Sequence, residues 1–174
     1  GDAGAMANLG FCLAKGVGVS QNKQQAFEWY KRAATLGNAV AMFNLGLCFE
    51  KGDGVVRDMK QTIEWWQRAA ELGYADAMHN LGVVLFKGFT GTQDKQQAIK
   101  WWKQAAAVGH VQAMNNLGEI FFKGDGVEKN KQQAVAWFKQ AADLGDAEAM
   151  FKLGVCFEKG DGVLQNQQQA FEWY

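Results

Sequence analysis

Residues 41–55 read AMFNLGLCFEKGDGV, and this stretch decides the fold. The apolar residues Met42, Leu45 and Phe49 lie three and four positions apart, which is the spacing of one face of an α-helix. Lys51 and Gly52 come next, and a cation followed by a glycine is typical of a helix end. We therefore predict a helix that ends at Lys51 and is followed by a glycine-rich turn.

The same pattern recurs with a period of 36 residues, the interval between Leu9 and Leu45. A fixed period in this range is the signature of a repeat protein, in which each unit buries its apolar face against its neighbours. We therefore predict one solenoid domain over residues 1–174. Its repeats are predicted to span about residues 2–37, 38–73, 74–109, 110–145 and 146–174, the last one incomplete.

Each repeat is predicted to contain a second helix after the glycine-rich turn. An Asn or Asp precedes this helix and a Gln follows three residues later, which resembles a capping box. The helix then carries a tryptophan and an Ala-Ala pair. No segment alternates apolar and polar residues with period two, so we predict no strands. The N-cap candidates are Asn22, Asp58, Asp94, Asn130 and Asn166.

Small and large residues at fixed places indicate how the two helices of a repeat pack. Gly46 lies inside the first helix, where glycine costs about 1 kcal/mol relative to alanine. We expect close approach of the second helix to compensate for this cost. The seven tryptophans are interpreted mainly as core or inter-repeat residues, and not as a stacking platform for nucleic acid or sugar.

Together, these features resemble the Sel-one-like repeat family, which is related to the tetratricopeptide repeat. The resemblance covers the whole chain and implies an all-α fold, a right-handed α–α superhelix of helix pairs. It also implies that the first helix of each repeat lines the concave side. Repeat three departs from the pattern, because Thr90 stands where the other repeats have a second glycine and Gly91 where they have valine.

The bulk composition excludes several classes of protein. Lys plus Arg and Asp plus Glu both total 18, so the chain lacks the basic excess of a nucleic-acid binder. There is no run of about 18 apolar residues, so no membrane span is predicted in this stretch. The N-terminus shows no signal peptide. The incomplete last repeat suggests a fragment of a longer array, whose uncapped ends could associate with each other.

The cysteines and histidines do not predict catalysis or metal binding. Cys12, Cys48 and Cys156 hold the same helix position in stacked repeats, roughly 8–10 Å apart, which is too far for a disulfide. We expect free, mostly buried thiols, which favours a reducing compartment such as the cytoplasm. His79 and His110 show no zinc spacing. We predict no enzyme activity, no cofactor and no metal.

The glycine-rich loop needs its own interpretation, because KGDGVEKNKQQ at residues 123–133 could hold a phosphate or a calcium ion. It lacks the GK[ST] ending of a phosphate loop and the alternating acids of a calcium loop. The loop also recurs at the same place in the repeat. We interpret it as a joint between two helices.

The resemblance implies that binding residues lie on the first helix of each repeat, where side chains differ between repeats. A row of asparagines could grip a peptide backbone, or could make a local hydrogen bond within each repeat. Phe86 and Phe122 are aromatic where neighbouring repeats have Glu, which is typical of interface anchors. The candidate residues are Phe43, Asn44, Leu47, His79, Asn80, Val83, Phe86, Asn115, Asn116, Glu119, Phe122 and Phe151.

We therefore expect a non-catalytic protein–protein interaction scaffold or adaptor. It would bind a partner peptide or helix in the concave groove and assist complex assembly, without a nucleic-acid partner. Two alternatives remain open at this point. The repeats could be a regulatory segment of a larger protein or enzyme, or an engineered consensus repeat scaffold.

Overall fold

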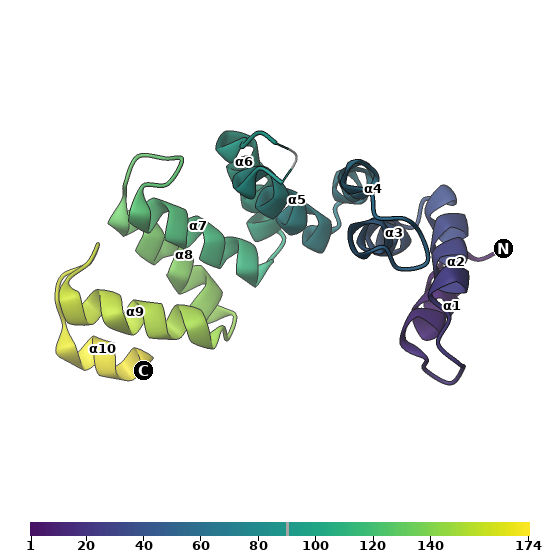
Figure 1. Cartoon of the computed structure of the whole chain (residues 1–174). Helices are drawn as coiled ribbons and strands as arrows, with labels where there is room; N and C mark the ends of the chain where they lie inside the picture. The colour runs from purple at the N-terminus through teal and green to yellow at the C-terminus, as the bar shows by residue number, and fades with distance from the viewer. Residues whose placement is uncertain (90) are drawn as a thin grey trace. The chain divides into compact units, whose positions relative to one another are not determined.

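The computed structural model describes residues 1–89 and 91–174, which form ten α-helices and no strand (Figure 1). This confirms the predicted all-α repeat of helix pairs. In the described part of the chain, no helix is long and apolar enough to cross a membrane. The predicted departure at Thr90 lies outside the described residues. The helices are α1 (Ala3–Lys15), α2 (Lys23–Thr35), α3 (Ala39–Lys51), α4 (Met59–Glu71), α5 (Ala75–Lys87), α6 (Lys95–Ala107), α7 (Val111–Lys123), α8 (Lys131–Asp143), α9 (Ala147–Lys159) and α10 (Gln167–Trp173).

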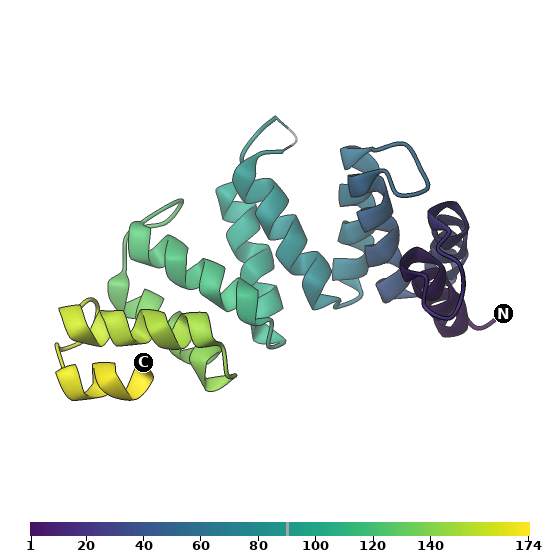
Figure 2. The same ribbon diagram turned by 60° about the horizontal axis from the view of Figure 1, so that its bottom comes forward.

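The chain divides into two compact units, Gly1–Gln93 with α1 to α5 and Asp94–Tyr174 with α6 to α10. The odd-numbered helices are the first helices of the repeats, called helix A below, and the even-numbered helices are helix B. Within each unit, every helix packs against its neighbours in chain order, as Figure 2 shows. This nearest-neighbour packing is that of a repeat solenoid. A single continuous domain stays a prediction.

Helix B begins at a side-chain cap, as predicted. Asn130 Oδ1 accepts a hydrogen bond from the backbone N–H of Gln133 at 2.9 Å, and the four other N-cap candidates make the equivalent bond. In a full capping box the Gln133 side chain would accept a hydrogen bond from the backbone N–H of Asn130. Here that N–H donates instead to the Phe121 carbonyl of helix A at 2.8 Å. The turn therefore ties the two helices of a repeat together.

The glycine inside helix A packs against an aromatic ring of helix B. A Cβ atom on Gly46 would lie 2.4 Å from Cδ1 of Trp66, and one on Gly118 would lie 2.3 Å from Cε1 of Phe138. No side chain larger than hydrogen fits there without a shift of the ring. The predicted close approach of helix B is confirmed, and its physical cause is the ring.

The tryptophan of fixed period is not the most deeply buried aromatic residue of helix B. Trp66 and Trp102, one position later, are 1% and 3% exposed. Trp65 is half-buried, and the Arg68 guanidinium lies 4.6 Å from the centre of its ring. The prediction of a mainly buried role is therefore confirmed for Trp66 and Trp102. It is only half right for the periodic row, which is Trp29, Trp65, Trp101, Trp137 and Trp173.

The glycine-rich loop is a joint, as interpreted, and it also connects consecutive repeats. Asp125 accepts a hydrogen bond from the Lys95 ammonium of the preceding helix B at 2.5 Å. Gly126 has φ 79°, and a Cβ there would lie 2.8 Å from Cβ of Lys95, so glycine satisfies both the backbone and the contact. The ion pair recurs between other repeats. At the equivalent positions between repeats two and three, the sequence has Met59 and Phe89.

Candidate functional site

The candidate residues of the N-terminal unit lie on α3 and α5, and several already have partners. The half-buried Phe43 ring stacks on Trp66, with 6.0 Å between ring centres, and lies 5.2 Å from the Tyr74 ring. Asn44 Nδ2 donates to the Val40 carbonyl at 2.9 Å. This bond is the local alternative considered for the asparagine row. The remaining candidates of this unit are half-buried, and they are Leu47, His79, Asn80, Val83 and Phe86.

Asn115 of α7 is buried, with 7% exposure. Its Nδ2 donates to Asp146 Oδ1, the N-cap carboxylate of α9, at 2.9 Å. Its Oδ1 has no hydrogen-bond partner among the described residues. A side chain in this position stabilises the contact between α7 and α9 and is closed to a partner, so we leave Asn115 out of the binding surface. Asn116, the next residue, is half-buried.

The C-terminal unit contains a recess between α7 and α9, against a ring of α8. It brings together three of the predicted residues, Glu119, Phe122 and Phe151. We call it the Phe122 recess, and its volume is about 190 Å³. Its lining is Glu119, Phe122, Phe138, Phe151, Lys152, Val155 and Cys156.

Four residues of the Phe122 recess were absent from the sequence-based site. They are Phe138, Val155, Cys156, which was expected to be a buried thiol, and Lys152, which is an exception to the row of asparagines. That exception was a usable signal, because a lysine appears in repeat five where repeats one to four have Asn. That the Phe138 ring lines the recess could not be predicted, because it depends on how the helices pack.

Paired charges form the rim of the Phe122 recess. Glu119 accepts hydrogen bonds from the ammonium groups of Lys123 at 2.6 Å and Lys152 at 3.0 Å, and Lys152 also pairs with Glu148 at 2.7 Å. Burial alone would raise the pKa of Glu119, but the bonds from both lysines outweigh it and hold that pKa below its ordinary value. Burial would lower the pKa of Lys152, and its two carboxylate partners raise it instead. Glu119 and Lys152 are therefore both held in their charged forms, and the two charges compensate each other.

The floor of the Phe122 recess is aromatic. The Lys152 ammonium lies 5.2 Å from the centre of the Phe138 ring, and the Lys131 ammonium lies 5.2 Å from that of Phe122. Phe151 is 60% exposed, and its ring centre is 5.7 Å from that of Tyr174. An exposed phenylalanine beside an apolar hollow is typical of a contact surface for another molecule.

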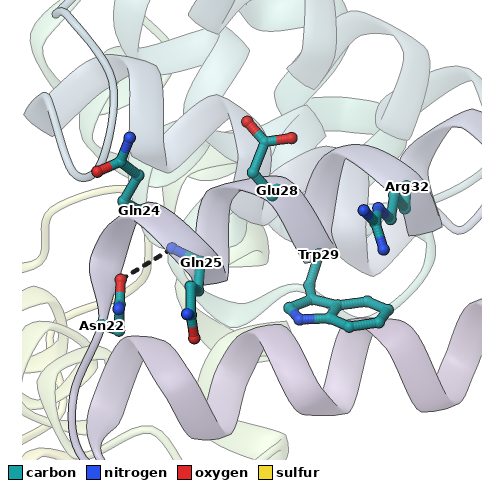
Figure 3. A pocket seen from close by; sticks show the side chains of 6 residues that line it. All are labelled: Asn22, Gln24, Gln25, Glu28, Trp29 and Arg32. Carbon is teal, nitrogen blue, oxygen red and sulfur yellow. Dashed lines mark hydrogen bonds between the residues drawn. The ribbon is translucent and has the colours of Figure 1, made fainter.

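A second hollow, with a volume of about 560 Å³, lies along α2 (Figure 3). Its lining is mostly polar, and the Arg32 guanidinium lies 4.9 Å from the centre of the Trp29 ring. Figure 3 also shows the N-cap bond from the Gln25 N–H to Asn22 Oδ1. This hollow is on helix B, away from the predicted binding residues, and it lacks an apolar floor. Its lining is Asn22, Gln24, Gln25, Glu28, Trp29 and Arg32.

The three cysteines are free thiols, as expected, with Cys48 and Cys156 buried and Cys12 half-buried. Burial, with a smaller contribution from the Asp53 carboxylate, raises the pKa of Cys48 from 9.0 to about 11. Burial and then Asp161 do the same for Cys156. Within residues 1–89 and 91–174, His, Cys, Asp and Glu form no group of three or more that could hold a metal ion.

We expect Cys48 and Cys156 to resist thiol reagents in the native protein at pH 8. A pKa raised from 9.0 to about 11 leaves about 100-fold less thiolate at that pH, and burial also excludes the reagent. Iodoacetamide labelling followed by peptide mapping should show Cys12 modified first. The other two should react readily only after unfolding, and their slow labelling in the native state should become faster as the pH rises from 9 toward 11. Equal labelling rates for all three thiols in the native protein would contradict this prediction.

The ten helices, the repeat period and the packing of helix B on helix A define an all-α repeat solenoid. The sequence model of the Sel1 repeat matches the chain five times, so the chain belongs to the Sel1 repeat family, which confirms the resemblance. Proteins of this family are generally non-catalytic scaffolds for protein interactions. The matched residues are 3–38, 39–74, 75–110, 111–146 and 147–174.

Solved structures support the family assignment. A Sel1 repeat protein from Oxalobacter formigenes is 35% identical with a TM-score of 0.88, and the match covers 99% of this chain and 69% of that one. The protective antigen c5321 of uropathogenic Escherichia coli, which displays the SLR fold, is 33% identical with a TM-score of 0.94, over 98% of this chain and 37% of that one. Helicobacter pylori cysteine rich protein B shares the fold at 22% identity, with a TM-score of 0.59 over 74% and 92% of the two chains. No curated protein sequence matches the chain.

Proposed function

We propose that this chain binds a peptide or a helix of a partner protein on its helix A surface, and so acts as a scaffold or adaptor in complex assembly. The observation that carries the proposal is the Phe122 recess, where predicted contact residues from two helices line one apolar hollow. Interface anchors of partner proteins bury themselves in hollows of this kind, inside a polar rim.

The variation of one helix A position between repeats supports the same surface. Phe122 and Phe86 occupy the position that is Glu50 in repeat two and Glu158 in repeat five. Because glutamate is found there in the same fold, the fold itself does not require an aromatic ring at this position. A half-buried phenylalanine in such a place is better explained by contact with another molecule.

We expect Phe122→Glu to weaken partner binding about tenfold or more while the helical content stays unchanged. The added charge would enter an apolar hollow, whereas repeats two and five carry Glu at this position without loss of the helix. A photo-crosslinking amino acid at position 122 should capture the partner, and the same amino acid at the exposed Ala136 of α8 should not. Isothermal titration calorimetry with the purified partner then measures the affinity of each variant.

The matched control is Ala136→Glu, because the equivalent residues Glu28 and Glu64 show that glutamate is accepted at that helix B position. It should leave the affinity unchanged, and the double variant Phe86→Glu/Phe122→Glu should bind least. The proposal fails if Phe122→Glu binds the partner as tightly as the unaltered chain, or if Ala136→Glu weakens binding to the same extent.

A further inference from the structure

We infer that the Phe122 recess receives one uncharged aromatic side chain, Trp or Phe, from the partner, and that Phe138 sets the depth of the recess. This inference rests on the proposed function and adds the chemistry of the ligand. It follows from a comparison of repeat four with repeat two of the same chain.

In repeat two the position of Phe138 carries Trp66, which belongs to a cluster of three rings. Phe43, Trp66 and Tyr74 form an aromatic cluster, in which Trp66 is 1% exposed and donates from Nε1 to the Phe43 carbonyl at 3.1 Å. In repeat four all three positions carry smaller side chains, of which only Phe138 lines the Phe122 recess. They are Asn115, Phe138 and Asp146.

The Phe122 recess lies against Phe138, where repeat four has a phenyl ring in place of an indole. Both rings pack against the equivalent glycine of helix A, since Gly118 contacts Phe138 as Gly46 contacts Trp66. The ring and the glycine therefore occupy equivalent positions in the two repeats, but the ring of repeat four is smaller than that of repeat two. A ring supplied by a partner would lie in the recess beside this smaller ring and gain contacts with its lining.

The charges of the rim exclude a charged occupant. Glu119, Lys123, Lys152 and Glu148 form a continuous series of ion pairs, so each charge already has an opposite partner. A charged side chain entering the recess would need to break one of these pairs, whereas a neutral one leaves them intact.

The lining favours an aromatic over an aliphatic occupant. Phe122, Phe138 and Phe151 present three rings, and aromatic pairs gain from edge-to-face and offset contacts beyond the area that they bury. The sulfur of Cys156 adds a favourable contact to a ring. An aromatic side chain can therefore contact both the rings and the sulfur atom that line the recess.

The variant that tests this inference is Phe138→Trp, which should fill the recess from within. The fold accepts an indole at this position, because Trp66 holds the equivalent place in repeat two. We expect the melting temperature to stay unchanged or to rise. A second variant, Val155→Phe, blocks the recess from α9 and copies Phe11, which holds the equivalent place in repeat one.

Tyr30→Trp is the matched control, because it makes the same kind of change at the same position of repeat one, outside the recess. A phage-displayed library of random dodecapeptides is selected on the unaltered chain, and the selected peptides are synthesised. We expect them to share one Trp or Phe. Their affinity should fall about tenfold or more on Phe138→Trp and Val155→Phe and should be unchanged on Tyr30→Trp.

The possible outcomes separate this inference from the proposed function. If the peptides share no aromatic residue, or bind Phe138→Trp normally while Phe122→Glu abolishes binding, the inference is wrong and the proposed function stands. If Phe122→Glu also binds them normally, both fail. If analytical ultracentrifugation shows a dimer that Phe138→Trp dissociates, the occupant is a second copy of this chain, and the inference of a separate partner is overturned.

Discussion

Replacing Trp66 with alanine is expected to lower the free energy of unfolding by about 4 kcal/mol. The Trp66 side chain is 1% exposed, its indole packs against Gly46, and its Nε1 donates to the Phe43 carbonyl at 3.1 Å. Alanine would leave a large cavity between α3 and α4 and would remove the donor to a buried carbonyl. Urea denaturation followed by circular dichroism measures the loss.

The matched control is Trp65→Ala, one residue earlier on the same helix. Trp65 is half-buried, and its ring also contacts the Arg68 guanidinium at the surface. We expect this variant to cost only about 1 kcal/mol, since much of the truncated ring already faces solvent. If Trp65→Ala is as destabilising as Trp66→Ala, the assignment of the buried ring to Trp66 is wrong.

Replacing Gly46 with alanine is expected to lower the free energy of unfolding by about 2 kcal/mol. This is opposite to what helix propensity predicts, because alanine in a helix is about 1 kcal/mol more favourable than glycine. The new Cβ would lie 2.4 Å from Cδ1 of Trp66 and 3.2 Å from the Thr62 carbonyl oxygen. The indole and α4 would have to move apart from α3, and packing would be lost along the contact.

Gly4→Ala in α1 is the control for Gly46→Ala. A Cβ on Gly4 would meet only Asp2 Oδ1, at 3.1 Å, which is the N-cap oxygen that accepts from the Ala5 N–H at 2.9 Å, so only this exposed end of α1 has to shift by a small amount. This variant should change the free energy of unfolding by less than about 1 kcal/mol, because the helix propensity of alanine offsets the disturbance of the cap. In a chain that already carries Trp66→Ala, most of the cost of Gly46→Ala should disappear, because the indole atoms are gone and only the 3.2 Å contact with the Thr62 carbonyl oxygen remains. A cost that stays the same in that background would contradict the proposed cause.

The repeat and the helix ends could be predicted from the sequence because they depend on local interactions. The Lys51–Gly52 stop ends α3, where Gly52 has φ 75° as a left-handed C-cap. The caps of helix B bond to an N–H only two or three residues away, so an Asx followed by Gln is enough to predict them.

The candidate site could be predicted only in part. Phe122, Phe151 and Glu119 were found because their positions carry different residues in different repeats, and the structure brings them to one recess. Asn115 differs as well, but for a different reason, because its amide bonds to Asp146, 31 residues away. A position whose residue varies between repeats is therefore one that the shared core does not fix. The variation alone does not tell whether its side chain contacts a ligand or makes a contact inside the core.

The sequence by itself determined the class of fold, the order of two helices in each repeat, the end of helix A and the start of helix B. These features follow from the period of apolar residues and from caps that involve at most a few neighbouring positions. The tertiary structure alone decided that Trp66 and not Trp65 is buried, that Asp125 pairs with Lys95, and that a recess opens beside Phe138. Each of these depends on contacts between side chains of different helices, about 20 to 30 residues apart, whose geometry exists only when the helices are packed.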